Sequence, residues 1–166
     1  MKGISKKEIK IISDLEFKKT YYFTTSDIKN HFENKRQMIN TIYILRKKGR
    51  IIKINKTKYF LVPIKARTGK WTDDPFIITD EICNGKDYLI GGWSAANYWK
   101  LTDQIPMQID IYTTRRQGKI KILNTRLVFH RTTKKRIENA VTKKIGEHNF
   151  RIQNKKDTKK WMKLRE

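Results

Sequence analysis

The chain has 166 residues, a formal net charge of +23 and a sequence pI near 10.2. This length suits one ordinary domain or two small ones, and the excess of Lys and Arg favours a polyanionic partner, because basic clusters release counterions from phosphates on binding. The single cysteine excludes an intramolecular disulfide. No apolar run reaches the roughly 18 residues that a membrane span needs. The basic N-terminus is not followed by the apolar segment of a secretory signal. We therefore expect a cytoplasmic protein without a membrane partner.

The basic residues are unevenly placed along the chain. Residues 1–66 carry 17 basic and 5 acidic side chains, residues 67–110 carry 4 and 7, and residues 111–166 carry 18 and 4. An AT-biased coding sequence would also raise the lysine content, as background surface charge. Two basic regions that flank a mildly acidic one make this background explanation the weaker of the two.

The first segments in chain order predict helices and a short strand. Apolar residues recur at helical spacing from Ser5 to about Phe17. The aromatic run at residues 21–23 has strand-like propensity. The next four residues, 24–27, offer N-cap hydroxyls and an acid for a second helix, which we expect from about Ser26 to Phe32.

A third helix is expected from Lys35 to Lys48, closed by Gly49 as a left-handed cap. After Gly49 the hydrophobic period changes, and residues 50–54 and 58–62 predict two strands joined by a tight turn. Three helices followed by a basic hairpin form the order of a winged helix-turn-helix. We assign this fold to residues 1–66.

The rest of the chain predicts a linker and a second domain. Residues 67–75 are expected to be the linker, and residues 76–166 a small mixed α/β domain, so the fold class is α+β. The pattern favours a helix start or short strand at the opening of this region and a helix from Trp93 to Lys100. Further strands are expected at residues 88–92, 108–113, 119–123, 126–130 and near 150–152.

The third helix is the best candidate for contact with DNA, because a helix fits the major groove and presents side chains to bases and phosphates. Arg36 suits guanine, whereas Gln37 and Asn40 have amides that suit adenine. The full set proposed for this helix is Lys35, Arg36, Gln37, Asn40, Tyr43 and Lys47, and the set proposed for the wing is Lys53, Lys56 and Lys58. The alternative is that these residues form only the solvated face of a surface helix.

An enzymatic interpretation rests on Gly91-Gly92-Trp93-Ser94, since nucleotidyltransferases place a glycine turn before two metal-binding carboxylates on a nearby strand. Transfer with two metals needs two convergent carboxylates. Asp110 is one candidate, but Tyr112 stands at the second position. The three histidines have no carboxylate or cysteine at ligand spacing. We therefore expect no catalytic residue, no metal and no cofactor.

Three motifs of the second domain carry a family resemblance. Gly91-Gly92-Trp93-Ser94-Ala95-Ala96, Leu101-Thr102-Asp103-Gln104-Ile105-Pro106 and Ile111-Tyr112-Thr113-Thr114-Arg115-Arg116 resemble the AbiEi family of antitoxins and transcriptional regulators. The resemblance, with the winged helix-turn-helix in front, covers most of the chain. Thr114 stands where the family has proline. Relatives usually continue beyond the position of Glu166, so a C-terminally shortened domain is expected.

The resemblance implies a type IV toxin–antitoxin system. Such an antitoxin represses its own promoter by binding inverted repeats in double-stranded DNA, and it counters a nucleotidyltransferase toxin without a stable complex. A dimer on DNA is compatible with paired half-sites. The alternative is a stand-alone winged-helix regulator without a toxin partner. RNA binding is a further alternative, favoured by the basic tail and by a second-domain basic surface at Arg115, Arg116 and Lys119.

Overall fold

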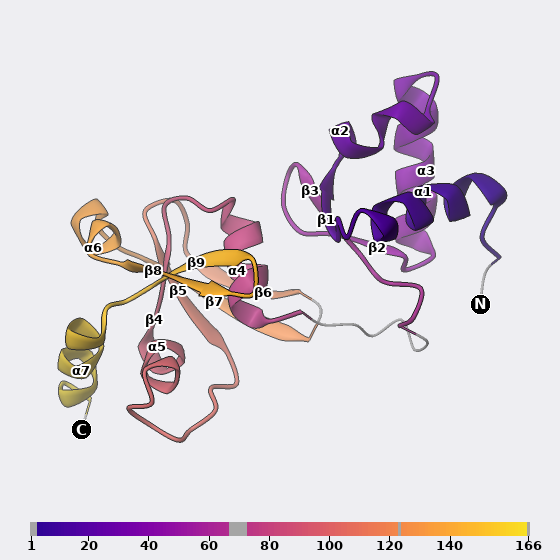
Figure 1. Cartoon of the computed structure of the whole chain (residues 1–166). Coiled ribbons are helices and arrows are strands. Elements are labelled where there is room, and N and C mark those ends of the chain that lie inside the picture. The colour runs from indigo at the N-terminus through magenta and orange to yellow at the C-terminus, as the bar shows by residue number, and fades with distance from the viewer. Residues whose placement is uncertain (1–2, 67–72, 123, 166) are drawn as a thin grey trace. The chain divides into compact units, whose positions relative to one another are not determined.

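The computed structural model describes residues 3–66, 73–122 and 124–165. The chain is mixed α+β and divides into two compact units, Met1–Trp71 and Thr72–Glu166 (Figure 1). Most of the predicted linker, residues 67–75, lies outside the described residues. Its last residue is not linker, because Pro75 opens a helix that Asp74 caps through the Phe76 N–H (2.8 Å).

Unit 1 contains helices and a three-stranded antiparallel sheet of order β1-β3-β2. Its elements are α1 (Lys6–Phe17), β1 (Tyr22–Thr24), α2 (Thr25–Ile28), the 3₁₀ helix η1 (Lys29–His31), α3 (Lys35–Lys47), β2 (Ile51–Lys53) and β3 (Lys58–Leu61). The core lies between α1, α3 and the sheet, where Ile11, Ile12, Leu45 and Leu61 are buried. The apolar stripes of the sequence therefore form one common core.

The second helix differs from its prediction. Instead of a helix from Ser26 to Phe32, α2 ends at Ile28 and the chain continues as the 3₁₀ helix η1. Ile28 is buried, whereas Lys29 and Asn30 are exposed, so there is little apolar surface to hold a longer helix. Asn34 then caps α3 by accepting the Gln37 N–H at 2.9 Å.

A buried ion pair joins the start of α1 to the end of α3. Glu8 forms a capping box with Ser5, and its carboxylate also accepts hydrogen bonds from Lys48 Nζ at 2.7 and 2.8 Å. Burial raises the pKa of the Glu8 carboxyl, but the hydrogen bonds from Lys48 and Ser5 outweigh this, so that its pKa is lowered. The pair fixes the position of α3 against α1.

Unit 2 contains a mixed sheet of order β6-β7-β5-β4-β9-β8. Its elements are α4 (Pro75–Cys83), β4 (Leu89–Gly91), α5 (Gly92–Tyr98), β5 (Ile109–Thr113), β6 (Gly118–Ile122), β7 (Thr125–Arg131), α6 (Lys134–Glu138), β8 (Val141–Ile145), β9 (His148–Ile152) and α7 (Lys155–Lys163). The pairs β5–β7 and β4–β9 are parallel, and the other neighbouring pairs are antiparallel.

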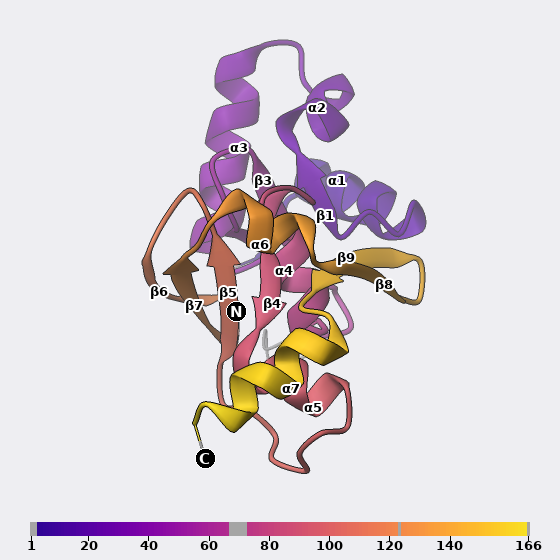
Figure 2. The ribbon, with the colours of Figure 1, turned by 90° about the vertical axis from the view of Figure 1, so that its left-hand side faces the viewer.

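The sheet of unit 2 has one apolar and one polar face. The register aligns Ile90, Ile111 and Phe129 on the apolar face. Helix α4 covers this face, and the tilted rings of its Phe76 and of Phe150 have their centroids 5.1 Å apart. The register of β5, β6 and β7 also defines the polar face. Its residues are Asp110, Tyr112, Lys119, Lys121, Arg126 and His130. Figures 1 and 2 place α4 and α6 on opposite sides of the sheet. On the polar face, the Arg136 guanidinium of α6 lies 4.0 Å from the centre of the Tyr112 ring of β5.

The Gly91-Gly92 pair forms the strand-to-helix turn that the sequence indicated, and close packing adds a second reason for both glycines. Gly92 has a φ of +61°, and a Cβ there would lie 2.8 Å from Asp110 Oδ2. Gly91 is extended, but its Cβ would lie 2.6 Å from the Tyr112 ring and 2.8 Å from Gln153 Oε1. The turn is therefore pressed against the polar face of the sheet.

Candidate nucleic-acid interface

The solvent-facing side of α3 has the composition of a groove-binding surface. Arg36, Asn40, Tyr43 and Lys47 are all exposed and lie opposite the buried Met38, Ile42 and Leu45. Lys47 Nζ lies 5.4 Å from the centre of the Tyr43 ring. The exposed fraction of Tyr43 is 54%, and that of Ile39 beside it is also 54%. The helix therefore offers both polar donors and apolar surface to a partner.

Two of the proposed residues lie at the flanks of this face. Gln37 turns toward α1, where its Oε1 accepts a hydrogen bond from Lys7 Nζ at 3.3 Å. Lys35 lies on the opposite flank, toward α2. Among the proposed base-contacting residues, Arg36 and Asn40 thus occupy the centre of the exposed face, and Gln37 its edge.

The hairpin of β2 and β3, which the sequence predicts to be a wing, is held by its own turn. Asn55 Oδ1 accepts hydrogen bonds from the N–H groups of Thr57 and Lys58, both at 2.9 Å. Lys53 and Lys56 are exposed, whereas Lys58 is half-buried and pairs with Thr24 of β1 in the register of the sheet. The first two lysines are therefore better placed for an external partner than the third.

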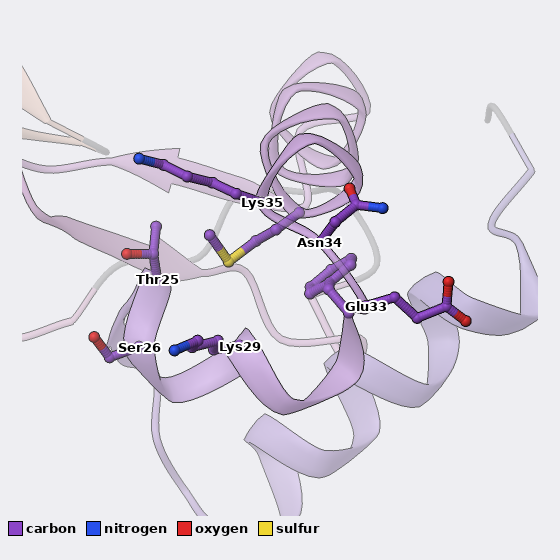
Figure 3. A pocket seen from close by; sticks show the side chains of 8 residues that line it. Thr25, Ser26, Lys29, Glu33, Asn34 and Lys35 are labelled. Carbon is purple, nitrogen blue, oxygen red and sulfur yellow. The ribbon is translucent and has the colours of Figure 1, made fainter.

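A recess of about 200 Å³ opens where α2 and η1 meet the start of α3. Figure 3 shows the hydroxyls of Thr25 and Ser26 and the amines of Lys29 and Lys35 around it. Glu33 and Asn34 also line it, and Figure 3 shows the Glu33 carboxylate directed away from the lysines. Two cations and two hydroxyls at one recess make a set of donors that fits a phosphate oxygen.

A second hollow joins α3 to the wing. This open groove of about 600 Å³ is lined by Tyr43, Arg46, Lys47, Gly49, Ile51, Ile52 and Lys53. Three of these are cations, and none is acidic. Arg46 was not among the residues proposed from the sequence, and neither were Thr25, Ser26 and Lys29. The signal for Arg46 was its place on the flank of α3 nearest the wing, which only the packing of β2 against α3 reveals.

The structure separates the three residues that were proposed as one basic surface on unit 2. Arg116 lies over the ring of Phe129 at 3.5 Å, on the apolar face, and Arg115 Nε pairs with Asp87 Oδ2 at 3.0 Å. Lys119 pairs with Val128 in the register and belongs to the polar face, with Lys121 and Arg126. Unit 2 therefore has two separate clusters of basic side chains, one with Arg115 and Arg116 and the other on the polar face with Lys119.

Each histidine lies beside a carboxylate that the sequence spacing did not show. His130 Nε2 and Asp110 Oδ1 lie 2.8 Å apart, His31 Nε2 and Asp14 Oδ2 3.2 Å, and His148 Nδ1 and Glu81 Oε1 3.8 Å. Asp110 also accepts from Gln108 Nε2 at 3.4 Å. No group of three or more His, Cys, Asp or Glu in the described part of the chain is arranged to hold a metal ion.

No family model matches the chain, and no curated protein matches it. Among solved structures, it is similar to the Rv2827c protein from Mycobacterium tuberculosis, with a TM-score of 0.56 and 16% sequence identity. The similarity covers 79% of this chain and 47% of that one, so the chain spans about half the length of this structural neighbour. At this identity the likeness concerns the fold alone. None of the helices in the described residues has the length and apolar composition that a membrane span needs.

Proposed function

We propose that unit 1 is a winged helix-turn-helix that binds double-stranded DNA and that the protein is a transcriptional regulator. The observation that carries this proposal is the continuity of donors along one side of unit 1: the recess at the start of α3, the exposed face of α3 and the groove to the wing. A helix with cations at both ends and amide and guanidinium groups between them matches the phosphate–base–phosphate order of a major groove.

The parts of this surface have different tasks. Arg36 and Asn40 contact base edges, since a guanidinium suits guanine and an amide suits adenine. The exposed Ile39 and Tyr43 add apolar contact with thymine methyl groups. Lys29, Lys35, Arg46, Lys47, Lys53 and Lys56 contact phosphates and set affinity and register.

The regulator is proposed to be an AbiEi-type antitoxin that represses its own promoter. This rests on the three motifs of unit 2 and on their order behind unit 1. The functional partner is then a nucleotidyltransferase toxin, and the neighbouring gene distinguishes this proposal from a stand-alone regulator, because an antitoxin gene lies beside its toxin gene. The catalytic alternative has less support from the sequence, because Tyr112 stands where the second metal-binding carboxylate would accompany Asp110.

Footprinting on the upstream region of the gene tests the DNA-binding proposal. The full chain is expected to protect an inverted repeat, and Asn40→Ala is expected to lose that protection while still binding DNA through its phosphate contacts. Ser13→Ala, at an exposed position of α1, serves as the matched control. Protection that spreads evenly over the fragment, unchanged by Asn40→Ala, would show charge-driven binding and contradict the proposal.

RNA binding by unit 2 is a second candidate function. The polar face of the sheet favours it, because Lys119, Lys121 and Arg126 lie together on strands β6 and β7. From Gly118 to Ile137 the sequence has seven Lys or Arg residues and no Asp or Glu. Competition between duplex DNA and structured RNA, in the wild type and in Lys121→Gln, tests it: an RNA affinity that Lys121→Gln does not lower argues against this face.

A further inference from the structure

Unit 2 has a hollow on the apolar side of its sheet, at the carboxyl end of β5. This hollow, the β5-end recess, has a volume of about 170 Å³ and is lined by Ile82, Cys83, Lys86, Asp87, Thr113, Arg115, Arg116 and Phe129. Strands β5 and β7 are parallel neighbours, and ligands of open α/β sheets bind beyond the carboxyl ends of such strands. The recess therefore lies where this kind of sheet offers a binding position.

The charges around the β5-end recess are unbalanced. Its lining contains three cations, Lys86, Arg115 and Arg116, and one carboxylate, Asp87. Asp87 Oδ2 is already used by two donors, Arg115 Nε at 3.0 Å and the Thr114 hydroxyl at 2.7 Å. Lys86 forms no ion pair with an acid of the described residues. An anion is therefore the ligand that this lining lacks.

All three cations belong to exposed residues, but Arg115 and Arg116 are each held by a neighbouring side chain. Asp87 engages Arg115 through Nε, which leaves the terminal guanidinium nitrogens available to donate a forked hydrogen bond to an anion. Arg116 is fixed over the Phe129 ring at 3.5 Å. Partial burial lowers the pKa of this guanidinium, a cost that a bound anion would offset.

The floor of the recess is apolar and unreactive. Cys83 is buried, and burial raises the pKa of its thiol to about 12, so the group is a neutral thiol at physiological pH. The volume is several times the roughly 30 Å³ that one water occupies in the liquid, so a phosphate group fits inside. A sugar or base attached to it would extend outward.

We infer that the β5-end recess binds the phosphate group of a small phosphorylated ligand, such as a nucleotide, through Lys86, Arg115 and Arg116. The phosphate oxygens accept hydrogen bonds from the terminal guanidinium nitrogens of Arg115 and from the Lys86 amine. The positive charge of Arg116 further stabilises the bound anion. Neither the DNA-binding proposal for unit 1 nor RNA binding on the polar face is needed for this inference.

The test is a titration of the ¹⁵N-labelled full chain with three probes at constant ionic strength: inorganic phosphate, adenosine monophosphate and a 5′-phosphorylated single-stranded oligonucleotide. Saturable shifts are expected for the amides of residues 83–87 and 113–116 with inorganic phosphate and with the monophosphate. Lys86→Gln and Arg116→Gln are each expected to weaken binding about tenfold, the loss of one charge-assisted hydrogen bond.

Lys144→Gln is the matched control, because it removes the same charge from an exposed position on β8, the far edge of the same sheet, and is expected to leave the affinity unchanged. Unperturbed spectra of the variants away from the recess verify that they fold. The inference is overturned if phosphate and the monophosphate cause no saturable shift at these amides, or if Lys144→Gln weakens binding as much as Lys86→Gln. Binding of the oligonucleotide alone, unaffected by Arg116→Gln, also overturns it.

Discussion

The salt dependence of DNA binding provides a quantitative test of the interface on unit 1. Six cations are assigned to phosphates: Lys29, Lys35, Arg46, Lys47, Lys53 and Lys56. Each neutralised phosphate contributes roughly 0.9 to the slope of log K against log salt, so six contacts correspond to a slope of about −5. Affinity is then expected to fall about 10³-fold between about 50 and about 200 mM salt.

Removing one phosphate contact changes this slope by a known amount. Lys53→Gln is expected to reduce it by about 0.9, so that the affinity ratio of wild type to variant shrinks about 3.5-fold over the same salt range. The change should be equal for the operator and for unrelated duplexes, because phosphates carry no sequence information. Fluorescence anisotropy with a labelled duplex of the upstream region, at five or more salt concentrations, measures both quantities.

Two further variants control for charge and position. Lys53→Arg keeps the charge and is expected to keep the slope, and Lys10→Gln removes an exposed lysine of α1 outside the proposed interface. The assignment of the wing is refuted if Lys53→Gln leaves the slope unchanged. It is equally refuted if Lys10→Gln lowers the slope by the same amount, since the effect would then report net charge.

Three other predictions concern specificity and stability. Arg36→Ala is expected to relax discrimination at one operator position by about 1–3 kcal/mol, measured on a panel of singly substituted duplexes; equal losses on every duplex would assign Arg36 to a phosphate instead. Glu8→Gln is expected to destabilise unit 1 by about 2 kcal/mol at pH 7, because it removes charged hydrogen bonds with Lys48. The pKa of Glu8 is lower in the folded protein than in the unfolded chain. The carboxylate therefore stabilises unit 1 fully at a pH above the unfolded-state pKa, and this contribution is lost as the pH falls through the folded-state pKa. In urea unfolding followed by resonances of unit 1, the difference between wild type and Glu8→Gln should therefore shrink as the pH is lowered below the ordinary pKa of a glutamate, and a constant difference would contradict the role of the carboxylate. Gly91→Ala is expected to destabilise unit 2 by about 1–3 kcal/mol through overpacking against Tyr112, whereas a thermal midpoint equal to the wild type would show that the ring moves aside freely.

The sequence predicted the secondary structure most accurately where a helical spacing of apolar residues continues over many residues. The helices at Lys6–Phe17 and Lys35–Lys47 begin and end within one residue of their expected limits, because their apolar stripes and caps agree. The segment at Pro75–Cys83 was left between helix and strand, since its apolar residues are nearly continuous; it is a helix because Asp74 and Pro75 start it.

The elements that were not foreseen lack such a stripe. Helix α6 has only five residues with Ile137 buried, β8 alternates half-buried with exposed residues, and α7 is mostly Lys. Their positions depend on distant partners. Trp161 of α7 packs edge-on against Trp93 at 5.2 Å, and β8 pairs with β9, and neither contact has a local sequence pattern.

The residues of the candidate sites were also predicted only in part, because some of them are brought together by distant elements. The exposed face of α3 followed from the helical wheel, but Lys29 and Arg46 joined the interface only through the packing of neighbouring elements. Arg115, Arg116 and Lys119 are close in sequence, yet a turn and the alternation of a strand send them to different faces of one sheet. Sequence proximity alone was therefore a poor guide to a shared surface.

The two outer strands of the unit 2 sheet have a consequence for self-association. β6 and β8 are its edges, and an unpaired edge is a template on which another chain can add a strand. Each edge carries two lysines, Lys119 and Lys121 on β6 and Lys143 and Lys144 on β8. When two copies approach edge to edge, like charges meet, and this repulsion disfavours pairing of the two edges.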